Sequence, residues 1–153
     1  MRVLIQRVKQ ASVIVDEKKV SEIGEGLLLF VGIGKGDSEE DIRYLCRKVT
    51  SLRIFEDGHG KMNLNVQQVN GQVLSVSQFT LYADTKKGNR PGFDQSADPD
   101  TAQQYCEKFN ELLRESGLHV REGIFAAHMK IDLVNDGPVT IWLESEKTVS
   151  SRE

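Results

Sequence analysis

The order of secondary-structure signals along the chain limits its possible folds more than any other feature of the sequence. Runs rich in valine and isoleucine predict strands over residues 2–15, 19–24, 26–33, 72–82, 118–124, 127–134 and 138–145. One predicted helix begins at Asp37 or Ser38 and runs to about residue 52, and a second is opened by Asp98-Pro99 and ended by Gly117. This order predicts an α+β fold: a single domain over residues 1–153, with a largely antiparallel, barrel-like sheet and two covering helices.

Length, composition and charge exclude several classes of protein. The 153 residues suit one ordinary domain, and 39% apolar with 28% charged residues is typical of neither a disordered chain nor a membrane protein. The net charge of -3 excludes a broadly cationic binder, so an RNA partner would need a local patch. No apolar run approaches ~18 residues and no signal peptide is recognisable, so a cytoplasmic location is expected. Cys46 and Cys106 fall on apolar helix stripes and are expected to be buried, reduced thiols.

Motifs for metal, cofactor and nucleotide binding are missing from the sequence. His59, His119 and His128 have no metal-ligand spacing. In the GxGxG run over residues 32–36, the third glycine comes one residue too early for a dinucleotide fingerprint, so a flexible turn is expected there. Neither a GxxxxGK[ST] loop nor a GxSxG elbow occurs. We therefore expect neither a metal nor a cofactor.

Three segments break their local pattern and are candidates for function. Arg7 lies on the predicted face of the odd-numbered apolar residues between 3 and 15, where a cation needs a partner. It either forms an ion pair at the strand edge or donates hydrogen bonds at a functional site, to backbone carbonyls or to an anion. Residues 77–80, SQFT, are polar residues at the end of a buried strand, where they either cap the strand or belong to a functional site. A Ser or Thr nucleophile in such a site would need a base within hydrogen-bond reach. Residues 135–138, NDGP, are typical of a hairpin turn, and X-Pro bonds in tight turns are sometimes cis. Of the predicted loops 56–65 and 83–98, the second is long enough to suggest a function.

Two of these segments resemble the signatures of the D-aminoacyl-tRNA deacylase family. Residues 77–81, SQFTL, fit the pattern SQxxL, and residues 135–140, NDGPVT, fit NxGPVT. The stretches MRVLIQRVKQASVIV, GLLLFVGIGKGD, KMNLN and KKGNRPGF are also similar to family members, so the likeness extends from Met1 to about Glu144. It implies an enzyme that hydrolyses the ester between a D-amino acid, or glycine, and the 3′-terminal adenosine of tRNA, and that rejects L-aminoacyl groups.

The resemblance also implies how the site is assembled. The protein would be a homodimer with active sites at the subunit interface, and a cis Gly137-Pro138 peptide of one subunit would reach into the pocket of the other. Its carbonyls would bind the substrate α-amino group and leave no room for an L side chain. The N–H groups around Phe79 and Thr80 would bind the ester carbonyl and its developing oxyanion. The 2′-hydroxyl of the terminal ribose would help to activate water, with Thr80 as nucleophile the alternative.

The same resemblance assigns supporting roles to other residues. Ser77 and Gln78 would shape the pocket, and Arg7 would brace the Gly137-Pro138 carbonyls. Phe125 and Met129, which share parity on a predicted strand, would flank the terminal adenine.

Cations of the long loop complete the expected site. Lys86, Lys87 and Arg90 would contact phosphates of the acceptor end, although a solvated run of charge has the same appearance. Core packing is likewise an alternative for Phe125 and Met129.

Two other functions of the whole protein stay open. One is a non-catalytic module that binds tRNA or another nucleic acid through Lys86, Lys87 and Arg90, and the other is an unrelated small-molecule hydrolase.

Overall fold

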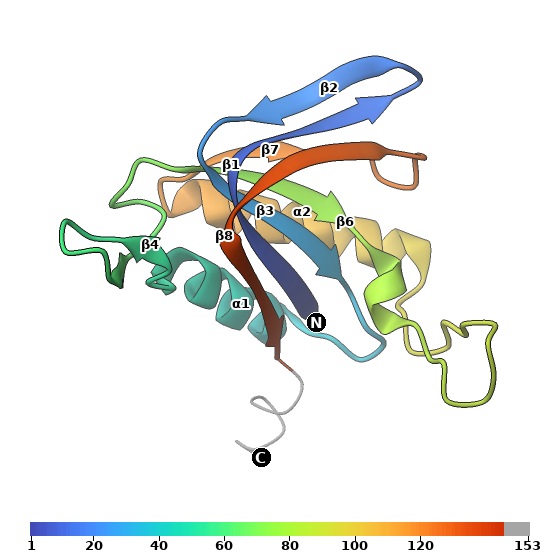
Figure 1. Cartoon of the computed structure of the whole chain (residues 1–153). Coiled ribbons are helices and arrows are strands. Elements are labelled where there is room, and N and C mark those ends of the chain that lie inside the picture. Colours follow the sequence, from blue (N-terminus) through green and yellow to red (C-terminus); the bar gives the residue numbers. More distant parts are fainter. Residues whose placement is uncertain (146–153) are drawn as a thin grey trace.

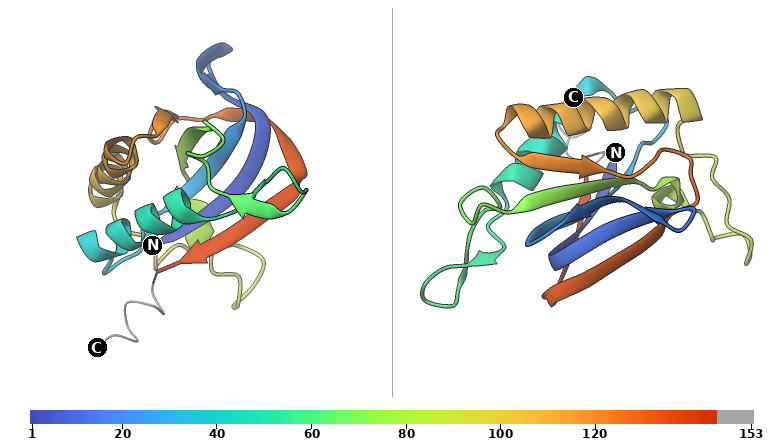
Figure 2. Two further views of the ribbon diagram at one scale, coloured as in Figure 1. Left: turned by 90° about the vertical axis from the view of Figure 1, so that its left-hand side faces the viewer. Right: turned by 90° about the horizontal axis from the view of Figure 1, so that it is seen from above.

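The computed structural model describes residues 1–145, in which a strongly curved sheet carries two long helices on one side (Figures 1 and 2). In chain order, the elements are β1 Arg2–Val15, β2 Lys18–Ile23, β3 Gly26–Gly32, α1 Glu39–Ser51, β4 Phe55–Glu56, β5 Met62–Leu64, β6 Gln72–Ser77, the 3-10 turn η1 Phe79–Tyr82, α2 Pro99–Glu115, β7 His119–Glu122 and β8 Lys130–Glu144. Within this described range, no helix is long and apolar enough to span a membrane.

The sheet is mixed, which corrects the prediction of a largely antiparallel one. Its order is β2-β1-β3-β6-β7, with β8 paired to β1 on the other side. β1 runs antiparallel to β2, β3 and β8, whereas the pairs β3–β6 and β6–β7 are parallel. Parallel neighbours need a crossover connection, and here α1 and α2 lie in those two connections. The predicted α+β domain with two covering helices is confirmed.

The helices begin where local capping signals place them. Ser38 precedes α1 and its backbone N–H donates to the Asp41 carboxylate at 2.9 Å, so the cap is Ser38 and not Asp37. The Asp98 carboxylate accepts from the Thr101 N–H at 3.1 Å and opens α2 ahead of Pro99. Apolar residues of both helices pack on one face of the sheet: Ile42, Leu45, Cys46, Val49, Ala102, Cys106, Phe109 and Leu113. Both cysteines are free and buried, as predicted.

β1 does not keep one face to the helices, contrary to the sequence prediction. Val3 and Ile5 belong to the core under the helices, but Ala11 and Val13 belong to a second core on the opposite face. The pairing of β1 with β8 shifts register on both sides of Val8, so the odd-numbered positions change face there. Arg7 lies at this change of face.

Several predicted strand boundaries also need correction, because pairing with neighbouring strands decides where a strand begins and ends. The strand expected over residues 72–82 ends at Ser77, and residues 79–82 form η1 instead. The expected strands 127–134 and 138–145 are one strand, β8, so residues 135–138 are not a hairpin turn. The expected loop 56–65 overlaps a two-stranded β4–β5 ribbon, and residues 123–129 form a loop between β7 and β8.

Candidate active site

The residues SQFT lie where β6 gives way to a helical turn. The Gln78 N–H donates to the Val31 carbonyl at 2.8 Å and so ends the strand alongside β3. The Gln78 side-chain amide donates to the Thr80 hydroxyl oxygen, which links the first residues of the turn. Phe79 and Thr80 are the first two residues of η1, and the first N–H groups of a helical turn have no partner within it. The turn can therefore offer two adjacent backbone donors to a carbonyl oxygen.

A cavity of about 570 Å³ opens beside this turn. It lies at the carboxyl ends of β3 and β6, between α2 and the start of β8. Its lining residues are Val31, Ile33, Val76, Ser77, Gln78, Phe79, Phe93, Ser96, Ala97, Pro99, Ala102, Phe125, Ala126, Ala127, His128, Met129 and Ile131. The structure thus brings three of the SQFT residues together with Phe125 and Met129. Phe125 and Met129 lie on the loop before β8, so the prediction that a strand carries them is wrong. Both nevertheless line the same cavity.

Phe93 is a cavity residue that sequence reasoning missed. Its ring meets that of Phe79 edge-on, with centroids 4.9 Å apart and planes at 66°. Phe79 is 55% exposed, so the pair lies at the cavity mouth. The sequence did contain a signal for it, because Phe93 is an aromatic residue at the end of the polar run KKGNRPGF. A loop that is only solvated has no need of an aromatic side chain.

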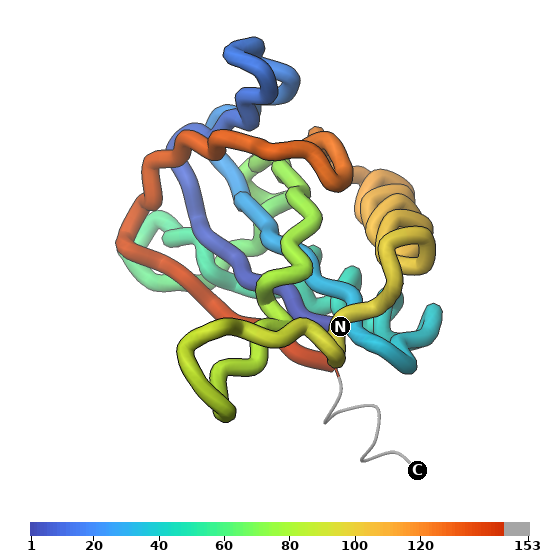
Figure 3. The backbone as a smooth tube through the Cα atoms, turned by 90° about the vertical axis from the view of Figure 1, so that its right-hand side faces the viewer, coloured from blue at the N-terminus to red at the C-terminus, as the bar shows by residue number. Residues whose placement is uncertain are grey.

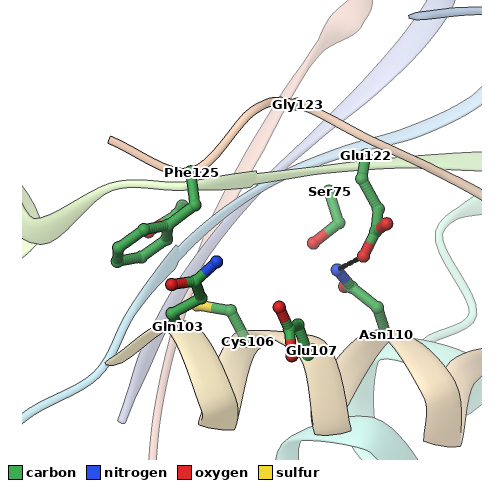
Figure 4. A pocket seen from close by; sticks show the side chains of 9 residues that line it. Ser75, Gln103, Cys106, Glu107, Asn110, Glu122, Gly123 and Phe125 are labelled. Atoms are coloured by element: carbon green, nitrogen blue, oxygen red, sulfur yellow. Dashed lines mark hydrogen bonds between the residues drawn. The ribbon is translucent and has the colours of Figure 1, made fainter. Parts of the chain in front are cut away.

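A smaller polar cavity of about 140 Å³ lies between α2 and the strands β6 and β7 (Figure 4). It shares Ser77 and Phe125 with the larger cavity. Burial raises the pKa of the Cys106 thiol to about 11, although a hydrogen bond with Ser77 works against this rise. The thiol is therefore neutral at pH 7 and is not an activated nucleophile.

The segment containing Gly137-Pro138 is a wide bulge in β8. Gln6 pairs with Thr140 and Val8 pairs with Asn135, so residues 136–139 lie opposite Arg7 alone. The Asn135 side chain closes the base of this bulge: its carbonyl oxygen accepts from the Val139 N–H at 2.8 Å, and its amide donates to the Val139 carbonyl at 3.1 Å. The Gly137-Pro138 peptide bond is cis, and both residues are exposed.

Arg7 holds the bulge from below. Its Nε donates to the Asp136 carbonyl at 2.8 Å and its Nη1 donates to the Ile54 carbonyl at 2.6 Å. The carbonyl that Arg7 holds is therefore that of the residue before Gly137, which corrects the expectation that it braces Gly137 and Pro138 directly. With an exposed fraction of 5%, Arg7 lines a different cavity from the SQFT residues, and no described residue lines both. One chain alone does not bring the two signatures together.

The long loop presents its cations at a closed tip. Backbone hydrogen bonds in both directions between Asp84 and Gly92, at 2.8 and 2.9 Å, close the loop. Lys86, Lys87 and Arg90 lie between them and are exposed, and none forms an ion pair within the described part of the chain. Figure 3 shows this loop projecting from the body of the molecule. Phe93 follows it directly, so the tip and the cavity mouth are connected.

The described part of the chain contains no cluster of side chains that could bind a metal ion. No three His, Cys, Asp or Glu side chains of residues 1–145 gather where they could hold an ion. The three histidines are exposed on separate segments.

Comparison with known proteins decides the family. The family model described as "D-Tyr-tRNA(Tyr) deacylase" matches residues 4–144. The chain belongs to the D-aminoacyl-tRNA deacylase family. Its membership makes it a hydrolase of this type. The D-aminoacyl-tRNA deacylase of Thermotoga petrophila is 58% identical over 147 residues, covering 96% of this chain and 99% of that protein. That of Exiguobacterium sp. is 58% identical over 144 residues, covering 94% and 98%.

Two solved structures share the deacylase fold. The structure named "c-Myc DNA Unwinding Element Binding Protein" has a TM-score of 0.90 and 38% identity, covering 95% of this chain and 99% of that one. A probable eukaryotic D-amino acid tRNA deacylase has a TM-score of 0.77 at 18% identity, covering 93% and 97%. The second likeness concerns the fold alone.

Proposed function

We propose that this chain hydrolyses the ester bond of D-aminoacyl-tRNA, and of glycyl-tRNA, to free tRNA and the amino acid, and that it rejects L-aminoacyl groups. The observation that carries the proposal is the cavity of about 570 Å³ with the η1 turn at its edge. Aromatic and thioether side chains suited to a nucleobase line the same cavity as Phe79, and the N–H groups of Phe79 and of the adjacent Thr80 are suited to an ester carbonyl. Substrates of this kind also favour a cytoplasmic location.

In the proposed reaction, the terminal adenine stacks between Phe125 and Met129. The ester carbonyl then accepts from the N–H groups of Phe79 and Thr80, which stabilise the oxyanion when water attacks. The bond between the carbonyl carbon and the ribose 3′-oxygen breaks, and that oxygen takes up a proton. The 2′-hydroxyl assists the attacking water, while Ser77 and Gln78 fix the shape of the pocket.

Thr80 separates this route from a covalent one. Thr80→Ala removes the hydroxyl and keeps the backbone donor, so the proposed route predicts near-normal single-turnover deacylation. Loss of the rate in a variant that still folds and binds the tRNA would instead make the hydroxyl a nucleophile.

Selection against L substrates is assigned to the Gly137-Pro138 segment of a second copy. Three observations support this assignment. The segment is exposed, it is held at its base by Asn135 and Arg7, and it lies away from the cavity of its own chain. Among the described residues β8 pairs with β1 alone, which leaves its outer edge accessible to a second copy. We therefore propose a homodimer in which each copy completes the other's cavity.

The cations Lys86, Lys87 and Arg90 are assigned to the phosphates of the acceptor end. They are exposed and project beside the cavity mouth, so a single-stranded tRNA end bound in the cavity would pass near them. A contact of this kind would weaken with salt.

Parallel assays of D-Tyr-tRNA and L-Tyr-tRNA test the proposed function. Selective hydrolysis of the D form is the expected result. Binding of both without hydrolysis would favour a nucleic-acid-binding module, a role that the name of the solved structure at 38% identity also suggests. Failure to bind or hydrolyse either would leave the small-molecule hydrolase.

A further inference from the structure

The η1 turn rests on the glycine run that follows β3. A Cβ at Gly34 would lie 2.6 Å from the Tyr82 hydroxyl oxygen and 2.8 Å from Cε1 of its ring. A Cβ at Gly32 would lie 3.1 Å from the Gln78 carbonyl oxygen and 3.2 Å from the Leu81 Cβ. Tyr82 is 4% exposed, so its ring occupies the space that these glycines leave. The GxGxG run, which resembles a dinucleotide fingerprint only superficially, is where the turn packs.

Arg2 holds the same turn from the start of β1. Its Nη1 donates to the Leu81 carbonyl at 2.8 Å, and its guanidinium carbon lies 4.2 Å from the centroid of the Tyr82 ring. The guanidinium also lies 5.6 Å from the Trp142 ring centroid and 3.5 Å from the Glu144 carboxylate, both on β8. Arg2 thus ties the turn to two strands of the sheet.

The turn needs such external contacts to keep its orientation. It has four residues, and its flanking backbone bonds are Leu81 to Gln78 at 3.2 Å and Ala83 to Thr80 at 3.1 Å. Short 3-10 turns have poorer hydrogen-bond geometry than α-helices, so packing has to fix their orientation. Donors to an oxyanion must also be placed to within about 0.5 Å.

We propose that Arg2, acting with Gly34 and Tyr82, is a positioning residue for deacylation. Arg2 and the Gly34 surface clamp the turn between them and so aim the N–H groups of Phe79 and Thr80 at the substrate carbonyl. Arg2 touches no substrate in this arrangement. This inference rests on the proposed function, because it concerns the same two donors.

Arg2→Met tests the inference, because it keeps an unbranched apolar stem and removes the guanidinium with its charge and donors. We expect a single-turnover rate on D-Tyr-tRNA about tenfold to a hundredfold lower, which is the scale for a displaced reacting group. The Kd for the tRNA should change less than twofold, because the adenine and phosphate contacts are untouched. Arg2→Lys keeps one donor and the charge and should recover part of the rate. Glu144→Gln, which removes the charge of this partner and keeps its size and an acceptor oxygen, should stay within twofold of wild type.

A second pair of variants guards against a general loss of folding. Gly34→Ala should lower the rate in the same way, because its Cβ displaces Tyr82. Gly58→Ala, whose Cβ meets nothing within 4 Å, is the matched control and should be neutral. Thermal unfolding must show that each variant is folded at the assay temperature.

The outcomes separate this inference from the function on which it rests. Wild type that leaves D-Tyr-tRNA intact would overturn the proposed function. Active wild type with Arg2→Met and Gly34→Ala both within twofold of it would overturn the positioning role alone. Loss of tRNA binding in parallel with the rate, or Arg2→Lys no better than Arg2→Met, would also overturn that role.

Discussion

Arg7 Nε lies 2.8 Å from the carbonyl oxygen of Asp136 and donates a hydrogen bond to it from within the core. The other end of the guanidinium donates to the Ile54 carbonyl. Arg7, a cation among the apolar residues of β1, therefore has a structural role. It satisfies two backbone carbonyls and fixes the position of the β8 bulge. The bulge in turn presents Gly137-Pro138 at the surface.

Removing Arg7 should destabilise the protein substantially. In Arg7→Met, the carbonyls of Ile54 and Asp136 lose their donor, and each buried group left unsatisfied costs about 1–3 kcal/mol. Urea unfolding should show a loss in this range or above it. Lys9→Met is the control, because Lys9 Nζ reaches Asp136 Oδ2 at 3.5 Å from a side chain that is 59% exposed. Its loss should be below about 1 kcal/mol, and equal losses in the two variants would contradict the account.

The Asn135 side chain should matter for selectivity more than for rate. Asn135→Ala removes the two hydrogen bonds that close the base of the bulge, so the Gly137-Pro138 carbonyls lose their fixed position. We expect the ratio of D-Tyr-tRNA to L-Tyr-tRNA hydrolysis to fall about tenfold or more, since tenfold corresponds to about 1.4 kcal/mol. Gln6→Ala removes a neighbouring bond to Thr140 at 3.3 Å and serves as the control. An unchanged ratio in Asn135→Ala would mean that the bulge does not select the substrate.

The Cys106 thiol should make stability depend on alkaline pH. Its pKa is raised from 9.0 to about 11 by burial, so the folded state holds the thiol proton more tightly than the unfolded state. The resulting stabilisation is fully present below pH 9 and is lost as pH rises through about 11. At about 1.4 kcal/mol per pKa unit, it amounts to roughly 2–3 kcal/mol. With reductant present, the stability of wild type relative to Cys106→Ala should fall by this order between those pH values. A constant difference would contradict the assigned burial effect.

Sequence reasoning located elements whose signals are local. Ser38 and Asp98 cap their helices through hydrogen bonds to residues three positions away, so both helices could be predicted closely. The single strand β8 could not, because its bulge exists only where β1 passes beside it. The parallel pairs of β6 likewise depend on how the two crossovers place α1 and α2.

The candidate site was predictable to a similar extent. The SQFT and NDGP segments stood out because each breaks its local pattern, and their interpretation came from family resemblance. The contact of Phe93 with Phe79 joins two segments through tertiary packing that no spacing encodes. The packing of Tyr82 on Gly34 is of the same kind.

The central claim is that the Gly137-Pro138 segment of one copy serves the cavity of the other, and mixing two inactive variants tests it most directly. Ala127→Trp fills the cavity. Gly137→Val disrupts the segment, because Gly137 has φ 158° and a Cβ there would lie 2.6 Å from the Val139 backbone nitrogen. Each variant alone should leave D-Tyr-tRNA intact, because Ala127→Trp excludes the substrate and Gly137→Val displaces the carbonyls proposed to bind its α-amino group. Asn135→Ala only loosens these carbonyls, so it keeps most of the rate.

After subunit exchange in an equal mixture, half of the dimers are mixed, and each mixed dimer has one cavity that is intact and faces an intact segment. The account predicts recovery of about one quarter of the wild-type single-turnover rate. A mixture that stays inactive although subunits have exchanged, or a wild-type protein that is monomeric and active, would contradict it.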